Sequence, residues 1–170
     1  MPLDNLAEDL LEAAFESLAH QFKQDHSHCD FIKLIIDEVN GDTFTFLLYN
    51  GASKYHWERK IWYKQNDIAK ISNPVDSLKY IGQKIIPNII KQQGVTNAEE
   101  AKEIFQLTRS LLELDSHEKS NEIVIDGTDY LLQIKLANTV KEFKWKTIPY
   151  GWAVVEQVSN KLITLNNKMY

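Results

Sequence analysis

An acid and a base two positions apart are the residues best placed to do chemistry. Glu58 and Lys60 lie in segment 54–63, where aromatic and β-branched residues predict a strand. Side chains two positions apart project from the same face of a strand, so the carboxylate and the ammonium group would be neighbours. Asp42 stands near the start of the preceding predicted strand. Two such carboxylates could hold a divalent ion against a phosphodiester while the lysine orients or activates a water molecule.

The elements predicted around these residues are a helix, three strands and a helix, and this order resembles the core of the PD-(D/E)xK nuclease family. The resemblance covers about residues 5 to 93. It implies a metal-dependent nuclease in which Asp42 and Glu58 bind the metal and Lys60 is the catalytic lysine. Glu16 of the first predicted helix would be a further acid. The alternative interpretation is an edge strand whose alternating charges discourage pairing with another chain.

Three histidines and the single cysteine lie close together in the sequence, at His20, His26, His28 and Cys29. Imidazole and thiolate are ligands that zinc prefers, but this spacing matches no familiar zinc site. The sequence also lacks a glycine-rich phosphate loop, a dinucleotide fingerprint, a nucleophile elbow, a His-Glu-x-x-His motif and a Cys-x-x-Cys pair. We therefore expect no bound metal and no cofactor, and a binding role is favoured over an enzymatic one.

The composition predicts one domain that spans residues 1–170, because 44% hydrophobic content and a net charge of −5 are typical of a globular chain of this length. The negative charge is concentrated near the start. Residues 1–40 contain nine acidic residues and two lysines. Such an acidic region could steer a basic partner, although charged residues on a helix are often only its solvated face.

The sequence also indicates where the protein resides. Its first residues lack the basic start and apolar block of a secretory signal. No apolar run approaches the roughly 20 residues that span a bilayer. Cys29 is the only cysteine, which fits a reducing compartment. We expect a soluble, cytoplasmic protein with no membrane partner.

Apolar spacing and turn residues predict an α+β fold in which helices pack on an antiparallel sheet. Helices are predicted at residues 5–24, at 74–93 with a kink at Pro87, and at 97–114 with a capping box from Thr96 to Glu99. Strands 31–39, 43–49 and 54–63 would form a three-stranded meander with turns at Asn40-Gly41 and Asn50-Gly51. Four or five further strands are predicted at residues 122–125, 130–136, 141–148, 152–158 and 162–165.

Some aromatic residues are candidates for an exposed binding surface. Trp62 shares a predicted strand face with Glu58 and Lys60, opposite the apolar face, which makes it the best candidate for an exposed anchor. Trp145 and Trp152, in a lysine-rich stretch, could form a second patch, with core packing as the simpler interpretation.

These observations favour an intracellular protein-binding module. More specifically, we expect an immunity protein of the bacterial toxin–antitoxin type, which covers the active site of a basic, nuclease-like toxin with carboxylates. The residues expected to bind the partner are Glu8, Asp9, Glu12, Glu16, Asp37, Glu38 and Trp62. The alternatives are the metal-dependent nuclease and a homodimer joined through an exposed edge strand. A nucleic-acid partner is not expected of so acidic a chain.

Overall fold

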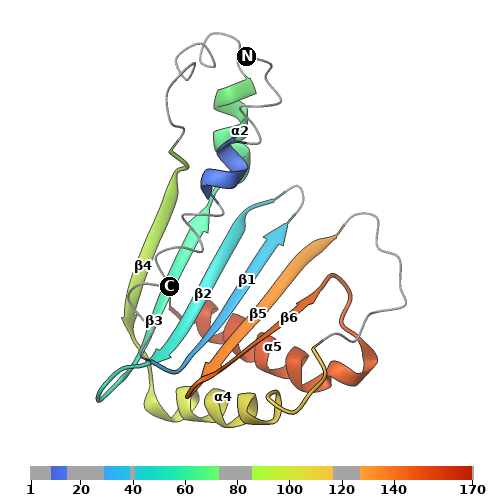
Figure 1. Ribbon diagram of the computed structural model, residues 1–170. Helices are drawn as coiled ribbons and strands as arrows, with labels where there is room; N and C mark the ends of the chain where they lie inside the picture. The colour runs from blue at the N-terminus through green and yellow to red at the C-terminus, as the bar shows by residue number, and fades with distance from the viewer. Residues whose placement is uncertain (1–8, 15–28, 39–40, 73–85, 117–126, 170) are drawn as a thin grey trace.

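A six-stranded antiparallel sheet organises the computed structural model, which describes residues 9–14, 29–38, 41–72, 86–116 and 127–169. The strands are β1 (Phe31–Glu38), β2 (Thr43–Asn50), β3 (Tyr55–Trp62), β4 (Ile89–Val95), β5 (Thr128–Leu136) and β6 (Thr139–Trp145). Their order across the sheet is β4-β3-β2-β1-β5-β6, so β1 is central and β4 and β6 are the edges (Figure 1).

Helices α4 (Ala98–Ser110) and α5 (Ala153–Asn167) cover one face of this sheet (Figure 1). A short 3-10 turn, η2 (Tyr150–Trp152), leads into α5. The main core between these helices and the sheet includes Ile32, Leu34, Phe46, Leu48, Trp57, Leu132, Phe143, Trp152, Val158 and Leu162, all buried. Ile32, Leu34 and Ile36 of β1 point into this core, because successive side chains of a strand alternate between its faces.

A second, smaller core lies beyond the end of β3. There α2 (Lys64–Ser72) follows the strand directly, and the helical segment 9–14 lies beside it (Figure 1). Leu10, Ala14 and Trp62 are buried together, with Ile68 of α2 and Ile89 of β4 packed against them. Among the described residues, no helix is both long and apolar enough to cross a membrane.

The predicted α+β class and the antiparallel meander are confirmed. β1 pairs with β2 and β2 with β3, both antiparallel, close to the predicted bounds. The predicted helix 97–114 corresponds to α4, although its N-cap is Asn97, whose side chain accepts a hydrogen bond of 2.8 Å from the Glu99 N–H, and not Thr96. The predicted first helix is seen at residues 9–14. The rest of it, and the predicted strand 122–125, lie outside the described residues.

The prediction of a helix over residues 74–93 is wrong at its C-terminal end. Residues 89–95 form the edge strand β4, which pairs antiparallel with β3. Gly94 allows the close pairing of these two strands. A Cβ at this position would lie 2.9 Å from the Trp57 ring, so only glycine lets β4 approach β3 closely at that point. Because β4 occupies the edge, β3 is an internal strand, and the edge-strand interpretation of segment 54–63 is also wrong.

The two strands predicted at 152–158 and 162–165 are wrong as well, since Trp152 ends η2 and the other residues belong to α5. Val155, Val158, Leu162 and Leu165 are buried on one face of that helix. Their separations of three and four are helical, but the many β-branched residues nearby favoured a strand. The remaining difference is α2, a helix that the sequence analysis did not predict.

Candidate partner-binding site

The register of the sheet gathers acidic residues at one end, which we call the acidic end. It consists of Asp9, Glu12, Asp37, Glu38, Asp42 and Asp129. Asp37 pairs with Thr43, and Thr43 pairs in turn with Trp62. The indole of Trp62 packs on Leu10, so the helical segment that carries Asp9 and Glu12 lies at the same end as the last residues of β1 (Figure 1).

Two carboxylates face each other across the centre of this end. Asp37 of β1 is directly opposite Asp129 of β5. Like charges in that position repel, so both need compensation. Lys64 Nζ lies 2.7 Å from Asp37 Oδ1, which also accepts a hydrogen bond of 2.5 Å from the Thr43 hydroxyl. Lys146 Nζ lies 3.5 Å from Asp129 Oδ2. These lysines offset part of the repulsion between the two carboxylates.

The outer acids are Asp9, Glu12 and Glu38, and all three are exposed. Asp42, in the connection between β1 and β2, is half-buried. The connection is held by a 3.3 Å hydrogen bond from the Gly41 N–H to the Glu38 carbonyl. Of the residues predicted to bind a partner, the structure therefore brings together Asp9, Glu12, Asp37 and Glu38. Glu8 and Glu16 lie outside the described residues.

Trp62 is not an exposed anchor, and this prediction is wrong. Its side chain is 0% exposed, because the helical segment 9–14, Ile68 and Ile89 cover the strand face on which it lies. The indole N–H donates a hydrogen bond of 2.9 Å to Asp67 Oδ2. Trp62 thus anchors the helical segment 9–14 to the sheet and is not itself available to a partner.

Asp67 of α2, which accepts the hydrogen bond from the Trp62 indole, has a perturbed pKa. Burial raises the pKa of its carboxyl, but the Asn88 backbone N–H, the Trp62 indole and Lys70 all donate to it and together lower that pKa below its ordinary value of 3.8. The bonds measure 2.7 Å from Asn88 and 3.0 Å from Lys70 Nζ. One ionised carboxylate therefore joins β3, α2 and the start of β4.

The structure brings Glu58 and Lys60 together but not into an open cleft. Their charged atoms are 4.0 Å apart, and their side chains are 6% and 2% exposed. Lys91 of β4 approaches Glu58 Oε2 at 3.0 Å, while Glu58 Oε1 is buried with no hydrogen-bond partner. Thr43 pairs with Trp62, four residues beyond Glu58, so Asp42 lies about 13 Å or more along β3 from that carboxylate.

The other candidate residues take structural positions. Trp152 is 0% exposed, and its indole donates to the Asp115 carbonyl at 3.0 Å. Trp145 stacks on Tyr130 with ring centroids 5.3 Å apart. Cys29 is half-buried, while the three histidines considered with it lie outside the described residues. Within the described ranges, no group of three or more histidine, cysteine, aspartate or glutamate side chains could hold a metal ion.

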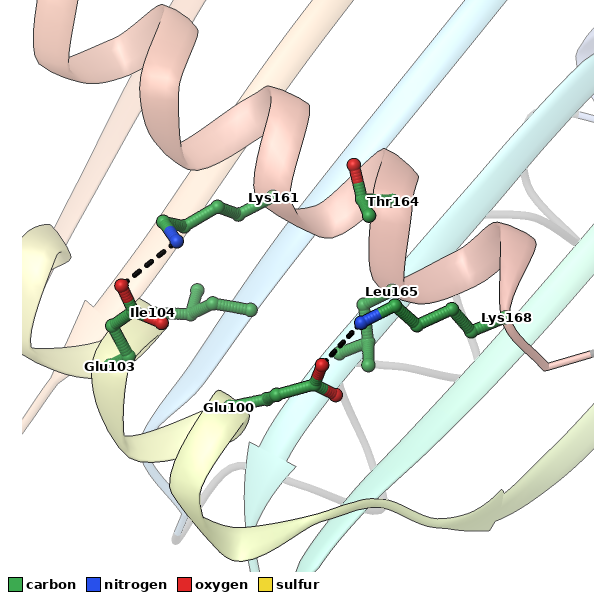
Figure 2. Close-up of a pocket in the computed structure, with 7 residues that line it drawn as sticks. All are labelled: Glu100, Glu103, Ile104, Lys161, Thr164, Leu165 and Lys168. Carbon is green, nitrogen blue, oxygen red and sulfur yellow. Dashed lines mark hydrogen bonds and ion pairs between the residues drawn. The ribbon is translucent and has the colours of Figure 1, made fainter.

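A small hollow of about 200 Å³ lies between α4 and α5 on the helical side of the molecule. Figure 2 shows that two ion pairs cross it, one from Lys161 to Glu103 at 2.9 Å and one from Lys168 to Glu100. The apolar side chains of Ile104 and Leu165 lie between the two pairs. Both lysines that line the hollow are therefore paired with glutamates of α4.

Sequence reasoning missed Asp129 as part of the acidic end, and it missed Asp67 as the acceptor of the Trp62 indole. Asp129 reaches the acidic end only through the pairing of β1 with β5, which no local signal in the sequence reveals. Asp67 lies on α2, which was not predicted.

Comparison with known proteins found no matching protein-family model, no similar curated protein and no similar solved structure.

Proposed function

We propose that this chain is a protein-binding module that holds a basic partner protein against its acidic end. The finer proposal is an immunity protein, which neutralises a nuclease-like toxin by covering the cationic active site with carboxylates. The observation that carries both is the convergence of acids from the helical segment 9–14, from β1 and from β5 at one end of a rigid sheet. A patch of one sign attracts and orients a partner of the other sign.

The acidic end has two features that suit such a role. Its outer carboxylates, on Asp9, Glu12 and Glu38, are exposed and available for contact. The carboxylate of Asp37 is held in place by Lys64 and the Thr43 hydroxyl, so this part of the surface is shaped before a partner arrives. A preorganised surface loses less conformational entropy on binding than a flexible one.

The experiment is to isolate the bound protein from the native source and measure association with it at rising salt concentration. Reversing the charge of the three outer acids (D9K, E12K, E38K) should weaken binding at least tenfold, mainly through a slower association rate, and should flatten the salt dependence. Glu113→Lys is the matched control, because Glu113 is exposed after the end of α4 and away from the acidic end. Salt-insensitive binding, or equal loss in the control, would reject the electrostatic mechanism.

The alternative function, a metal-dependent nuclease, is favoured by one observation: Glu58 and Lys60 lie on the same strand face with their charges 4.0 Å apart. Against it stand the burial of both side chains and the distance to Asp42. Incubating the protein with DNA or RNA and magnesium or manganese separates the two functions. Cleavage that disappears in both Glu58→Gln and Lys60→Met would replace the binding proposal, and these near-isosteric changes limit the loss of folding.

A further inference from the structure

A groove lies at the opposite end of the sheet from the acidic end. Two hollows of about 500 and 520 Å³ adjoin each other, because Asn50 and Tyr55 line both, and we call them together the α4 groove. One wall is α4. The other consists of the β2–β3 and β5–β6 turns, and Figure 1 shows α4 running beneath these strand ends.

The helical wall presents a regular stripe of side chains to the groove. Ala98, Lys102, Phe105 and Arg109 line it and recur at separations of four, three and four, which places them on one face of α4. At about 1.5 Å per residue the stripe is about 16 Å long. Apolar and cationic side chains alternate along it.

The floor of the groove is apolar. The rings of Tyr55 and Phe105 are in contact, with centroids 5.5 Å apart. Leu112 and Leu136 line the same hollow and are half-buried. An occupant could therefore bury an apolar side chain at the middle of the groove, between the flanking cations.

The charge of the groove is positive. Lys54, Lys102 and Arg109 line it and are exposed. Asp30 is the one carboxylate among the described residues that line it, and its Oδ1 already accepts a hydrogen bond of 2.6 Å from the Ala137 N–H.

Two acids of α4 do not offset these cations, because they face the other way. Glu100 and Glu103 point toward α5 and pair with Lys168 and Lys161 (Figure 2). The helix thus carries its paired charges on the side that faces α5 and leaves the cations of the groove face without compensation from these glutamates.

We propose that the α4 groove binds an extended, acidic segment of a partner protein. Lys102 and Arg109 are seven residues apart on the helix, or about 10.5 Å, which matches about three residues of an extended chain. The expected segment has two acidic residues three positions apart with an apolar side chain between them, placed over Tyr55 and Phe105. A nucleic acid fits less well, because three cations on a chain of net charge −5 offer little against repulsion of a phosphate backbone.

This inference does not depend on the proposed function of the acidic end, and its test uses different probes. The probes are a fluorescein-labelled octapeptide with two glutamates flanking Leu-Tyr, the same peptide with glutamine at both positions, and a labelled single-stranded oligonucleotide of eight thymidines. Fluorescence anisotropy of each is followed as the full chain is added. The glutamate peptide should bind at least tenfold more tightly than the glutamine peptide.

Charge-reversal variants show where on the chain the glutamate peptide binds. Lys102→Glu and Arg109→Glu should each weaken binding of the glutamate peptide at least fivefold, and together they should abolish it. Lys144→Glu is the matched control, because Lys144 is an exposed lysine on β6 with its side chain 72% exposed, and it should leave binding unchanged. Circular dichroism of each variant confirms that the fold is retained.

Four results would overturn the inference: no binding of the glutamate peptide, equal binding of the glutamine peptide, unchanged binding in the double variant, or tighter binding of the oligonucleotide. A separate measurement is the sedimentation of the unliganded chain. Self-association that Arg109→Glu abolishes would make a second copy of the chain, and not a separate partner, the occupant of the groove.

Discussion

The indole N–H of Trp62 donates a hydrogen bond of 2.9 Å to Oδ2 of Asp67, five residues further along the chain. This contact joins the last residue of β3 to the first turns of α2. It lies beneath the helical segment 9–14, whose Leu10 and Ala14 pack on the same indole. The position of the helical segment 9–14 on the sheet therefore depends on a side chain that is held by a buried, charge-assisted hydrogen bond.

Removing the Asp67 carboxylate should destabilise the protein substantially. Asp67→Ala leaves the buried Trp62 indole N–H and the part-buried Asn88 backbone N–H without their acceptor. We expect a loss of about 2–4 kcal/mol in the free energy of unfolding, since an unsatisfied buried donor costs about 1–3 kcal/mol. Urea denaturation monitored by tryptophan fluorescence measures it. Asn66→Ala, at an exposed position of α2, is the control and should cost little.

Asp67 should also make stability depend on pH in the acid range. Its pKa is lowered in the folded state, because the donors from Asn88, Trp62 and Lys70 outweigh the effect of burial. Its contribution is therefore fully present above the ordinary pKa of 3.8 and is lost as the pH falls through the lower folded value. Urea titrations of the wild type and Asp67→Asn between pH 2.5 and 6 should converge at the acid end. A constant difference between them would contradict this assignment.

The ion pair of Lys64 with Asp37 should be worth more than an ordinary surface pair. The Lys64 side chain is 7% exposed, and Asp129 faces Asp37 from the neighbouring strand. Lys64→Met would leave two carboxylates opposed, and we expect a loss of about 2–4 kcal/mol at pH 7. Adding Asp37→Asn should restore part of it. A double-mutant cycle gives the coupling, and strictly additive losses would mean that the pair contributes nothing.

A methyl group at Gly94 should loosen the β4 edge. The new Cβ would lie 2.9 Å from Trp57 ring atoms of the neighbouring strand, so strand or ring must shift. Gly94→Ala should cost about 1–3 kcal/mol, the range typical of overpacking. It should also change the fluorescence of Trp57 in the folded protein. Gln93→Ala, one position earlier with an exposed side chain, should be nearly neutral in both measurements.

The two interhelical ion pairs of Figure 2 should contribute little to stability. The charged side chains of Glu103 and Lys161 are 59% and 32% exposed, so water and salt screen them. Glu103→Gln should lower the free energy of unfolding by less than about 1 kcal/mol, and less still in 0.5 M salt. Thermal denaturation at two salt concentrations checks this. A larger, salt-independent loss would show that the pair has a role in packing.

Local patterns predicted the elements whose signals agree with one another. Strands β1 to β3 combine β-branched residues with turns rich in asparagine and glycine, and α4 combines a helical stripe with an N-cap and two acids in its first turn. The signals conflicted in α5, where the spacing of Val155, Val158 and Leu162 is helical but valine, isoleucine and threonine, which are β-branched, are frequent. Tertiary packing against the sheet decided that element.

The candidate site was less predictable because it depends on pairing between distant segments. The acidity of residues 1–40 was visible, but Asp129 joins the acidic end only through the register of β5. The exposure of Trp62 could not be judged from β3 alone. Strand alternation correctly placed Trp62 on the face opposite the main apolar core. The face that carries Trp62 is nevertheless covered, by Leu10 and Ala14.

The central position of β1 determines the order in which the sheet can be completed. Glu38 of β1 pairs with Thr128, which is 90 positions later, so one backbone edge of β1 has no partner until β5 leaves the ribosome. The apolar side chains of β1 are covered by α5 later still, because α5 comes last among the described elements. A nascent chain therefore exposes this edge and the apolar face of β1 until the later segments have been made, and such surfaces are prone to aggregation.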